Sequence, residues 1–117
     1  MPDRKRRGRE TETLVAAAFS TDGWPFAIAA NSGANGRDVL NLPGLSCEVK
    51  ARAGFDPMAN LRQAIRYSQG DVPFVVMRPN GYGPTTIDEW PVLFTFGQAR
   101  RLLRLAGYGD PLPEEEL

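Results

Sequence analysis

The sequence predicts an α/β (α+β) protein in which helices flank one mixed central sheet. Two observations lead to this fold class. First, 117 residues suffice for a single domain with one modest core and are too few for two ordinary domains. Second, apolar segments of strand type and amphipathic segments of helix type follow one another in the order α-β-β-β-α-β-β-α. We therefore expect the helices to pack on the faces of the sheet.

The first half of the chain predicts one helix and three strands. The segment "RETETLVAAAF", residues 9–19, contains good helix formers and an apolar face, so it is expected to be helical. "STDG" at residues 20–23 ends that helix, and a flexible loop is expected at "NSGANG", residues 31–36. Strands are expected at residues 24–30, 38–42 and 45–52, the last two forming a hairpin around Pro43-Gly44.

The second half predicts a helix, two strands and a closing helix. Asp56 followed by Pro57 is a typical helix start, because aspartate caps the first turn and proline is tolerated there. This helix is expected to continue to Gln69. "VPFVVMR" at residues 72–78 is almost entirely apolar, which indicates a buried central strand. Beyond it the sequence predicts a long mobile loop around Gly81 and Gly83, a strand at residues 90–96 and a helix at residues 97–107.

The composition excludes several classes of protein and enzyme. No apolar stretch approaches the roughly 20 residues of a membrane span, and no signal peptide follows the charged start "MPDRKRRGRE", so we expect a cytosolic protein. The single cysteine, Cys47, cannot form an internal disulfide, which agrees with a reducing compartment. The absence of histidine excludes Ser-His-Asp catalysis, Cys-His catalysis and histidine-ligated zinc. Any catalysis must therefore use carboxylates, lysine, hydroxyls or a metal held by oxygen atoms.

Charge is segregated at the two ends of the chain, although the formal net charge is zero. We divide the sequence into a basic arm at residues 1–8, one folded domain at residues 9–108 and an acidic tail at residues 109–117. Both ends are expected to be solvated. The basic arm could contact nucleic-acid phosphates or could only keep the protein in solution, and the charge run favours neither. The basic residues near this end are Arg4, Lys5, Arg6, Arg7 and Arg9.

The strand expected at residues 45–52 carries Glu48 and Lys50 on one face, because residues two apart in a strand point the same way. A Glu-X-Lys tripeptide is most often a simple ion pair on a half-exposed strand. Asp38 favours a functional site over a simple ion pair, since it begins the neighbouring strand and brings a second carboxylate to the same strand end. Both carboxylates and the carbonyl oxygen of Val49 could bind a hard divalent cation. Lys50 could then stabilise or deprotonate a water that attacks a metal-bound phosphodiester.

This site sets a condition on the hairpin. A tight two-residue turn at Pro43-Gly44 would pair Asp38 with Val49 and place Asp38 on the opposite face from Glu48. We therefore predict a loop of odd length, a β-bulge, or an Asp38 that lies just before regular pairing begins. Unbroken two-residue-turn pairing down to Asp38 would contradict the metal site.

Several motifs give the chain a resemblance to a nuclease superfamily. A basic segment contains Gly8 and, four residues later, Glu12; the loop "NSGANG" follows, and "GRD" and "EVK" are separated by a short strand and turn. The chain closes with "DEWPVLFTFGQARRLL", in which a Trp-containing strand is expected to precede a terminal helix. This pattern resembles the PD-(D/E)XK nuclease superfamily, and more narrowly the archaeal-type Holliday junction resolvases and related phage-encoded proteins. The resemblance covers most of residues 6–105.

The resemblance implies a restriction-endonuclease-like fold and a Mg²⁺-dependent endodeoxyribonuclease, with Mn²⁺ as an alternative ion. It implies hydrolysis of phosphodiesters in branched DNA such as four-way junctions, in recombination or repair, by a homodimer in the cytosol of a bacterium or a phage-infected cell. The implied catalytic residues are Glu12, Asp38, Glu48 and Lys50, with Asp38, Glu48 and Val49 as metal ligands. Glu10 competes with Glu12 as the helical carboxylate, and the sequence leaves that choice open.

The expected DNA-binding surface combines the basic arm with residues near the proposed site. Ser32 could orient a phosphate or a water, although Ser between Asn and Gly is usually only a turn residue. Arg62, Arg66 and Arg78 could line DNA or could be ordinary surface charges. Gln63 could reach the site from the second helix, although a solvated helix position is commoner. The predicted DNA-binding residues are Arg4, Lys5, Arg6, Arg7, Arg9, Ser32, Arg52, Arg62 and Arg66.

The sequence leaves two alternatives to the junction-cutting nuclease open. One is a nuclease of the same fold with another target, such as a nickase or a repair or packaging enzyme. The other is a non-catalytic nucleic-acid-binding module that kept the fold. The combination of Asp38, Glu48 and Lys50 argues against the binding module, because binding alone needs no such set.

Overall fold

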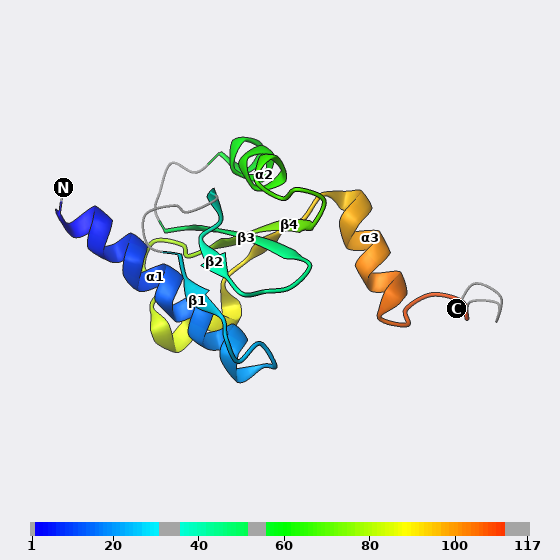
Figure 1. Cartoon of the computed structure of the whole chain (residues 1–117), viewed down its shortest axis with the longest axis horizontal. Helices are drawn as coiled ribbons and strands as arrows, with labels where there is room; N and C mark the ends of the chain where they lie inside the picture. Colours follow the sequence, from blue (N-terminus) through cyan, green and yellow to red (C-terminus); the bar gives the residue numbers. More distant parts are fainter. Residues whose placement is uncertain (1, 31–35, 52–55, 112–117) are drawn as a thin grey trace.

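The computed structural model describes residues 2–30, 36–51 and 56–111 of the chain (Figure 1). They form a five-stranded mixed sheet packed against helices, which confirms the predicted α/β class and the predicted order of helices and strands. A short 3₁₀ helix, η2, is added to that order. In chain order the elements are α1 (Pro2–Thr21), β1 (Ile28–Ala29), β2 (Val39–Leu40), β3 (Leu45–Lys50), α2 (Pro57–Arg66), β4 (Val72–Met77), η2 (Pro84–Glu89), β5 (Val92–Leu93) and α3 (Phe96–Leu105).

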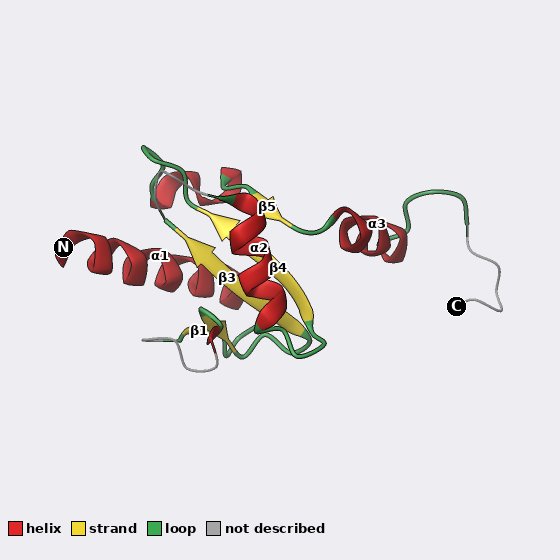
Figure 2. Cartoon of the chain, turned by 90° about the horizontal axis from the view of Figure 1, so that it is seen from above, coloured by secondary structure: helices red, strands yellow, loops and turns green. Residues whose placement is uncertain are grey.

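The strands of the sheet are arranged in the order β1-β2-β3-β4-β5. β3 and β4 are parallel, from Leu45 opposite Val72 to Lys50 opposite Met77. The other three pairings are antiparallel. Parallel neighbours need a crossover connection, and α2 provides it between β3 and β4. These two strands form the centre of the sheet, and α2 lies across one of its faces (Figure 2).

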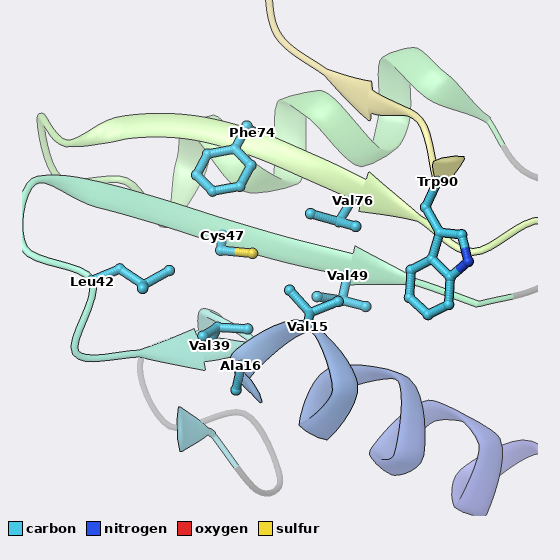
Figure 3. Packing of buried hydrophobic residues seen from close by; sticks show 9 residues of the cluster. All are labelled: Val15, Ala16, Val39, Leu42, Cys47, Val49, Phe74, Val76 and Trp90. Atoms are coloured by element: carbon cyan, nitrogen blue, oxygen red, sulfur yellow. The ribbon is translucent and has the colours of Figure 1, made fainter. Parts of the chain in front are cut away.

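α1 and α2 cover opposite faces of the sheet, and each completes its own hydrophobic cluster (Figure 1). Each cluster is built from one helix face and alternate residues of the strands, as the pleat of a sheet requires. The cluster under α1 contains Val15, Ala16, Val39, Leu42, Cys47, Val49, Phe74, Val76 and Trp90 (Figure 3). The cluster under α2 contains Leu61, Ala64, Val75 and Met77.

The first helix is longer than the sequence predicts. α1 begins at Pro2 rather than at Arg9, so the segment expected as a basic arm is helical from its second residue onward. Arginine and lysine are good helix formers, and Nε of Arg7 donates to the carbonyl oxygen of Ala51 at 3.0 Å. The basic side chains near the start of the chain are therefore carried by a helix and not by an extended arm.

β1 and β2 are shorter than the strands predicted at residues 24–30 and 38–42. Before β1, the N–H of Ala27 bonds to the carbonyl oxygen of Trp24 at 3.0 Å, and this turn delays the start of the strand. After β2, Asn41 takes a positive φ of 65°, which interrupts the extended backbone. β3, α2 and β4 lie within three residues of their predicted bounds.

The last third of the chain differs from the prediction in two ways. About half of the expected mobile loop is the 3₁₀ helix η2. The strand expected at residues 90–96 is reduced to β5, because the N–H of Trp90 bonds back to the carbonyl oxygen of Ile87 at 3.1 Å and closes η2. At the other end of that segment, Oγ1 of Thr95 accepts from the N–H of Gln98 at 3.1 Å and caps α3.

α3 projects from the sheet, away from α1 and α2 (Figures 1 and 2). None of its residues is buried. Phe96, Leu103 and Leu105 are 79%, 54% and 70% exposed, which is unusual for side chains of this size. The helix thus presents apolar surface that the rest of the described chain does not cover. Among the described residues, no helix has the length and apolar character needed to cross a membrane.

Candidate functional site

The β2-β3 hairpin has the one-residue offset that the proposed site requires. Val39 pairs with Cys47, whereas a two-residue turn would pair it with Glu48. The positive φ of Asn41 accommodates one extra residue between the strands. The predicted offset is confirmed, and this register places Asp38 on the same side of the hairpin as Glu48.

Asp38 lies just before β2 and is fixed by three hydrogen bonds. Its N–H bonds to the carbonyl oxygen of Cys47 at 3.0 Å, and its own carbonyl oxygen accepts from the N–H of Ala30 at 2.9 Å. Its carboxylate oxygen Oδ2 accepts from the N–H of Val49 at 2.7 Å. Asp38 therefore lies just before regular pairing begins at Val39, which is one of the three arrangements predicted from the sequence. The carboxylate of Asp38 is held against β3, next to Glu48.

Glu48 is a buried carboxyl group with an unused oxygen atom. The residue is 3% exposed, and its Oε2 has no hydrogen-bond partner among the described residues. Burial, a hydrogen bond with Asp38 and the charge of Asp38 raise the pKa of Glu48 from 4.5 to about 9, against the opposing effect of Lys50. Leaving a buried polar atom without a partner costs about 1–3 kcal/mol. Stability alone does not favour such an arrangement.

Lys50 emerges at the end of β3 on the same face as Glu48. Its Nζ donates to Oε1 of Gln63 on α2 at 3.4 Å, so α2 helps to orient the ammonium group. Its carbonyl oxygen accepts from the N–H of Arg78 at 2.8 Å, which holds the end of β3 against the end of β4. Gln63 therefore reaches the site, although the sequence favours a solvated position for it.

α1 contributes Glu12 to this group, and Glu10 points elsewhere. Burial and the charge of Asp38 raise the pKa of Glu12 from 4.5 to about 6, while Lys50 lowers it. Glu10 instead forms an ion pair with Arg78, in which Oε1 and Nη1 are 3.2 Å apart. Of the two glutamates that the sequence could not separate, Glu12 is thus the one placed near Asp38 and Lys50.

Three carboxyl groups and one ammonium group interact electrostatically around one end of β3. Glu12 comes from α1, Asp38 from the residue before β2, and Glu48 and Lys50 from β3. Burial, together with repulsion among the carboxylates, favours retention of protons when no cation is present. A divalent cation would replace these protons and would give Oε2 of Glu48 the partner it lacks.

The donor atoms fit a hard divalent ion that keeps part of its water shell. The side-chain donors are carboxylate oxygens, which Mg²⁺ prefers. In the part of the chain that the structure describes, no three Asp, Glu or Cys side chains are grouped closely enough to hold an ion by themselves. Mg²⁺ usually binds through one or two carboxylates together with waters and substrate phosphates, so Asp38 and Glu48 would suffice as its carboxylate ligands. The N–H of Val49 is used by Asp38. The role of the Val49 carbonyl oxygen as a ligand stays a prediction.

Most of the predicted DNA-binding residues that the structure describes have exposed side chains on α1 and α2. Exposed basic side chains on α1 and α2 are Lys5, Arg6, Arg9, Arg62 and Arg66. Arg7 differs from them, because its Nε and Nη2 donate to the carbonyl oxygens of Ala51 and Pro79 at 3.0 and 3.5 Å. These bonds hold the basic half of α1 beside the end of β3. Ser32, Arg52, the side chain of Arg4 and the acidic run Glu114 to Glu116 lie outside the described residues.

Arg78 is buried and does not line the surface. Its side chain is 7% exposed and donates to Glu10, to Oγ1 of Thr11 at 3.0 Å and to the carbonyl oxygen of Tyr82 at 2.9 Å. The guanidinium also lies 5.5 Å from the centre of the Trp90 ring. Arg78 is a structural link between α1 and the end of β4. Two of its acceptors, Glu10 and Thr11, come from the distant helix α1, so no local pattern in the sequence predicts its burial.

Glu12, Asp38, Glu48 and Lys50 form the candidate site, with Gln63 as a supporting residue. Comparisons with protein-family models, curated proteins and solved structures returned no match to this chain.

Proposed function

We propose that the chain is a metal-dependent DNA endonuclease of the PD-(D/E)XK type, with a restriction-endonuclease-like fold. Its proposed reaction is the hydrolysis of phosphodiesters in branched DNA such as four-way junctions. The observation that carries the proposal is the placement of Asp38 beside a buried Glu48, on the same strand face as Lys50. The unpartnered Oε2 of Glu48 adds support, because a bound ion would satisfy that atom.

Asp38 and Glu48 would hold the ion through their carboxylate oxygens, with the carbonyl oxygen of Val49 as the third proposed ligand. Mg²⁺ is the proposed cofactor and Mn²⁺ its substitute, since both prefer oxygen donors. When bound, the ion lowers the pKa of a coordinated water and neutralises charge on the phosphate. Glu48 must first lose the proton that its raised pKa retains at neutral pH.

The other groups have roles that their positions support. Lys50 places a positive charge beside the reacting phosphate, where it stabilises the negative charge that develops in the transition state. Gln63 keeps Nζ of Lys50 in place. Glu12, with a pKa of about 6, exchanges a proton near neutral pH and can accept one from the attacking water. No histidine is needed for any of these steps.

A purely structural role explains the cluster less well. If Glu48 and Lys50 were only an ion pair, the carboxylate would be satisfied by the ammonium group. Instead, Oε2 of Glu48 has no partner among the described residues, and Nζ of Lys50 contacts Gln63. Apolar residues of similar size would fill the same space without the cost of burying charge. Perturbed carboxyl groups of this kind are typical of functional sites.

DNA is the proposed substrate because exposed cations lie on both helices that contribute to the site. Arg7 fixes the basic half of α1 beside Ala51, one residue beyond Lys50. A phosphate backbone bound along α1 would therefore pass close to the proposed metal ligands, and cationic contacts of this kind position DNA without reading its sequence. The proposed location is the cytosol of a bacterium or a phage-infected cell.

The proposed assembly is a homodimer. A four-way junction presents two symmetry-related strands to cut, and a twofold dimer would bring one site to each of them. α3 supports this assembly, because it projects from the sheet with Phe96, Leu103 and Leu105 exposed (Figure 1). Burial of such side chains is the main driving force of most protein association.

The test is a cleavage assay on labelled four-way, forked and linear duplexes of the same sequence, with and without Mg²⁺. We expect cleavage of the four-way junction in Mg²⁺ and none in EDTA. Preferential cleavage of forked or linear DNA would indicate a nuclease of the same fold with another target. Binding of all three substrates without cleavage in Mg²⁺ or Mn²⁺ would contradict the proposed activity.

A further inference from the structure

We propose that Arg37 is a positioning residue that holds the backbone of Asp38 in place for metal binding. The inference rests on the proposed function, because it assigns Asp38 its role as a ligand. Arg37 directly precedes Asp38, and its side chain is 18% exposed. It belongs to the "GRD" segment, whose other charged residue is Asp38.

The guanidinium of Arg37 is almost fully used in hydrogen bonds. Nε donates to the carbonyl oxygen of Tyr67 at 3.1 Å, and Nη2 donates to that of Ser68 at 2.6 Å. Nη1 donates to the carbonyl oxygen of Leu45 at 3.3 Å and to Oδ2 of Asp71 at 2.9 Å. An arginine has five N–H donors, and four bonds leave little capacity for a phosphate. Arg37 is therefore placed to organise the protein and not to bind DNA.

These acceptors connect Asp38 to two other parts of the fold. Tyr67 and Ser68 follow the last turn of α2, where carbonyl groups lack partners inside the helix. Leu45 is the first residue of β3. The side chain of Arg37 thus ties the segment before β2 to the end of α2 and to the start of β3, the same strand that carries Glu48.

Gly36 strengthens this attachment. It has a positive φ of 75°, and a methyl group at this position would overlap the ring of Tyr67. The backbone at Gly36 therefore lies flat against Tyr67, while the next residue binds the carbonyl oxygen of the same tyrosine. Two consecutive residues before Asp38 are fixed to the end of α2.

Asp38 needs such an attachment because it lies outside β2. On one side it is held by its bonds to Cys47, Ala30 and Val49. On the other side its backbone continues into Arg37. If the Arg37 contacts were lost, the chain before β2 could rotate, and the carboxylate would leave the N–H of Val49. The hydrogen bond from Val49 to Oδ2 of Asp38 is thus a direct reporter of the proposed role.

The test compares Arg37→Met, Arg37→Lys and Asp71→Asn in the full-length chain. Arg37→Met removes all four bonds, whereas Arg37→Lys keeps the charge but loses the planar fork. Asp71→Asn is the matched control, because it removes the ion pair and leaves three carbonyl contacts intact. The first readout is the Val49 amide in the metal-free protein, monitored by its NMR chemical shift and its rate of hydrogen exchange. The second is the affinity for Mn²⁺ alone, measured by calorimetry.

In Arg37→Met we expect the Val49 amide to shift and to exchange about 10-fold faster or more. We expect the affinity for Mn²⁺ to fall about 10- to 100-fold, the loss typical of residues that orient a metal ligand. Arg37→Lys should resemble Arg37→Met, while Asp71→Asn should stay within about threefold of the unmodified protein. High Mn²⁺ concentrations should restore cleavage to Arg37→Met, because its defect lies in affinity and not in chemistry.

An unchanged Val49 amide in a folded Arg37→Met or Arg37→Lys protein would overturn the inference. Equal effects of Asp71→Asn and Arg37→Met would also overturn it, since the charge of the ion pair would then be the cause. Failure of the unmodified protein to bind Mn²⁺ or cut DNA would contradict the proposed function instead. The two failures are therefore separable. If Arg37→Met does not fold, Arg37→Lys decides the question by the same readouts.

Discussion

The backbone N–H of Val49 donates a hydrogen bond of 2.7 Å to Oδ2 of Asp38. In a regular antiparallel pair, an N–H in this place bonds to a backbone carbonyl group of the neighbouring strand. Here a side chain takes that place, at the point where the pairing of β2 and β3 ends. One contact therefore closes the hairpin and also places a carboxylate beside Glu48.

Glu48 should make the stability of the metal-free protein depend on pH. Its pKa is raised in the folded state from 4.5 to about 9, so the folded protein binds more protons than the unfolded chain between these values. The stabilisation is then fully present below pH 4.5 and is lost as the pH rises toward 9. We expect the free energy of unfolding, measured by urea titration in EDTA, to decrease over this range. The slope against pH should approach the value for a difference of one bound proton between the folded and unfolded states.

Two substitutions separate the groups responsible for this slope. Glu48→Gln should remove the slope between pH 6 and 9 and should stabilise the protein at pH 8. Glu12→Gln should change only the range from pH 4.5 to 6, because the pKa of Glu12 is raised to about 6. A Glu48→Gln protein that keeps the full slope above pH 6 would show that Glu48 is already ionised in the fold.

Gln63 is expected to affect the rate of cleavage and not DNA binding. Gln63→Ala removes the acceptor that Nζ of Lys50 uses at 3.4 Å, so the ammonium group becomes less well oriented. We expect kcat to fall on the order of 10-fold while KM stays nearly constant, as for other residues that orient a functional group. Asn60→Ala on the same helix is the control. Equal rates for Gln63→Ala and the unmodified protein would remove Gln63 from the site.

The exposed cations of α1 should govern the dependence of DNA binding on salt. Deleting residues 1–7 would shorten α1 and remove the anchor at Arg7, so Lys5→Gln with Arg9→Gln is the cleaner change. Each lost phosphate contact should flatten the plot of log affinity against log salt by about 0.9. Arg101→Gln on the projecting helix α3 is the control. If the double variant keeps the original slope in fluorescence anisotropy, these residues do not contact DNA.

α3 should be required for the proposed dimer. Leu103 is 54% exposed and would be buried by a second copy. Leu103→Glu should weaken dimerisation at least about 10-fold, since burying a leucine contributes about 1.5–3 kcal/mol and a charge adds a further cost. Gln98→Glu adds the same charge to the same helix and should have a smaller effect. Light scattering after gel filtration would contradict the dimer if the unmodified protein is monomeric at micromolar concentrations.

The central elements of the fold are predictable from local patterns. β4 is an apolar run, and α2 begins at the Asp56-Pro57 signal, where Oδ1 of Asp56 accepts from the N–H of Ala59 at 3.1 Å. β1 and β5 are edge strands, and their bounds depend on turns that no periodicity records. Trp90 is an example, because the sequence predicts it within a strand, whereas in the structure its N–H closes η2. Sequence patterns thus predict the centre of the sheet better than its edges.

The candidate site is predictable where strand geometry alone decides it. The shared face of Glu48 and Lys50 follows from the two-residue period, and the offset of Asp38 follows from the same parity argument. The long-range contacts of Arg37 and Arg78 could not be predicted, because acceptors such as Tyr67 and Glu10 lie 30 and 68 residues away in the sequence. The same holds for the raised pKa of Glu48, which depends on burial by the complete fold.

The most direct test of the proposed nuclease compares the unmodified protein with Asp38→Asn on a labelled four-way junction in Mg²⁺. Asparagine keeps an oxygen that can accept from the N–H of Val49, so the hairpin should be preserved while the charged ligand is lost. We expect the unmodified protein to cut the junction and Asp38→Asn to bind it with similar affinity without cutting. Cleavage by Asp38→Asn at the rate of the unmodified protein would contradict the assignment of the site.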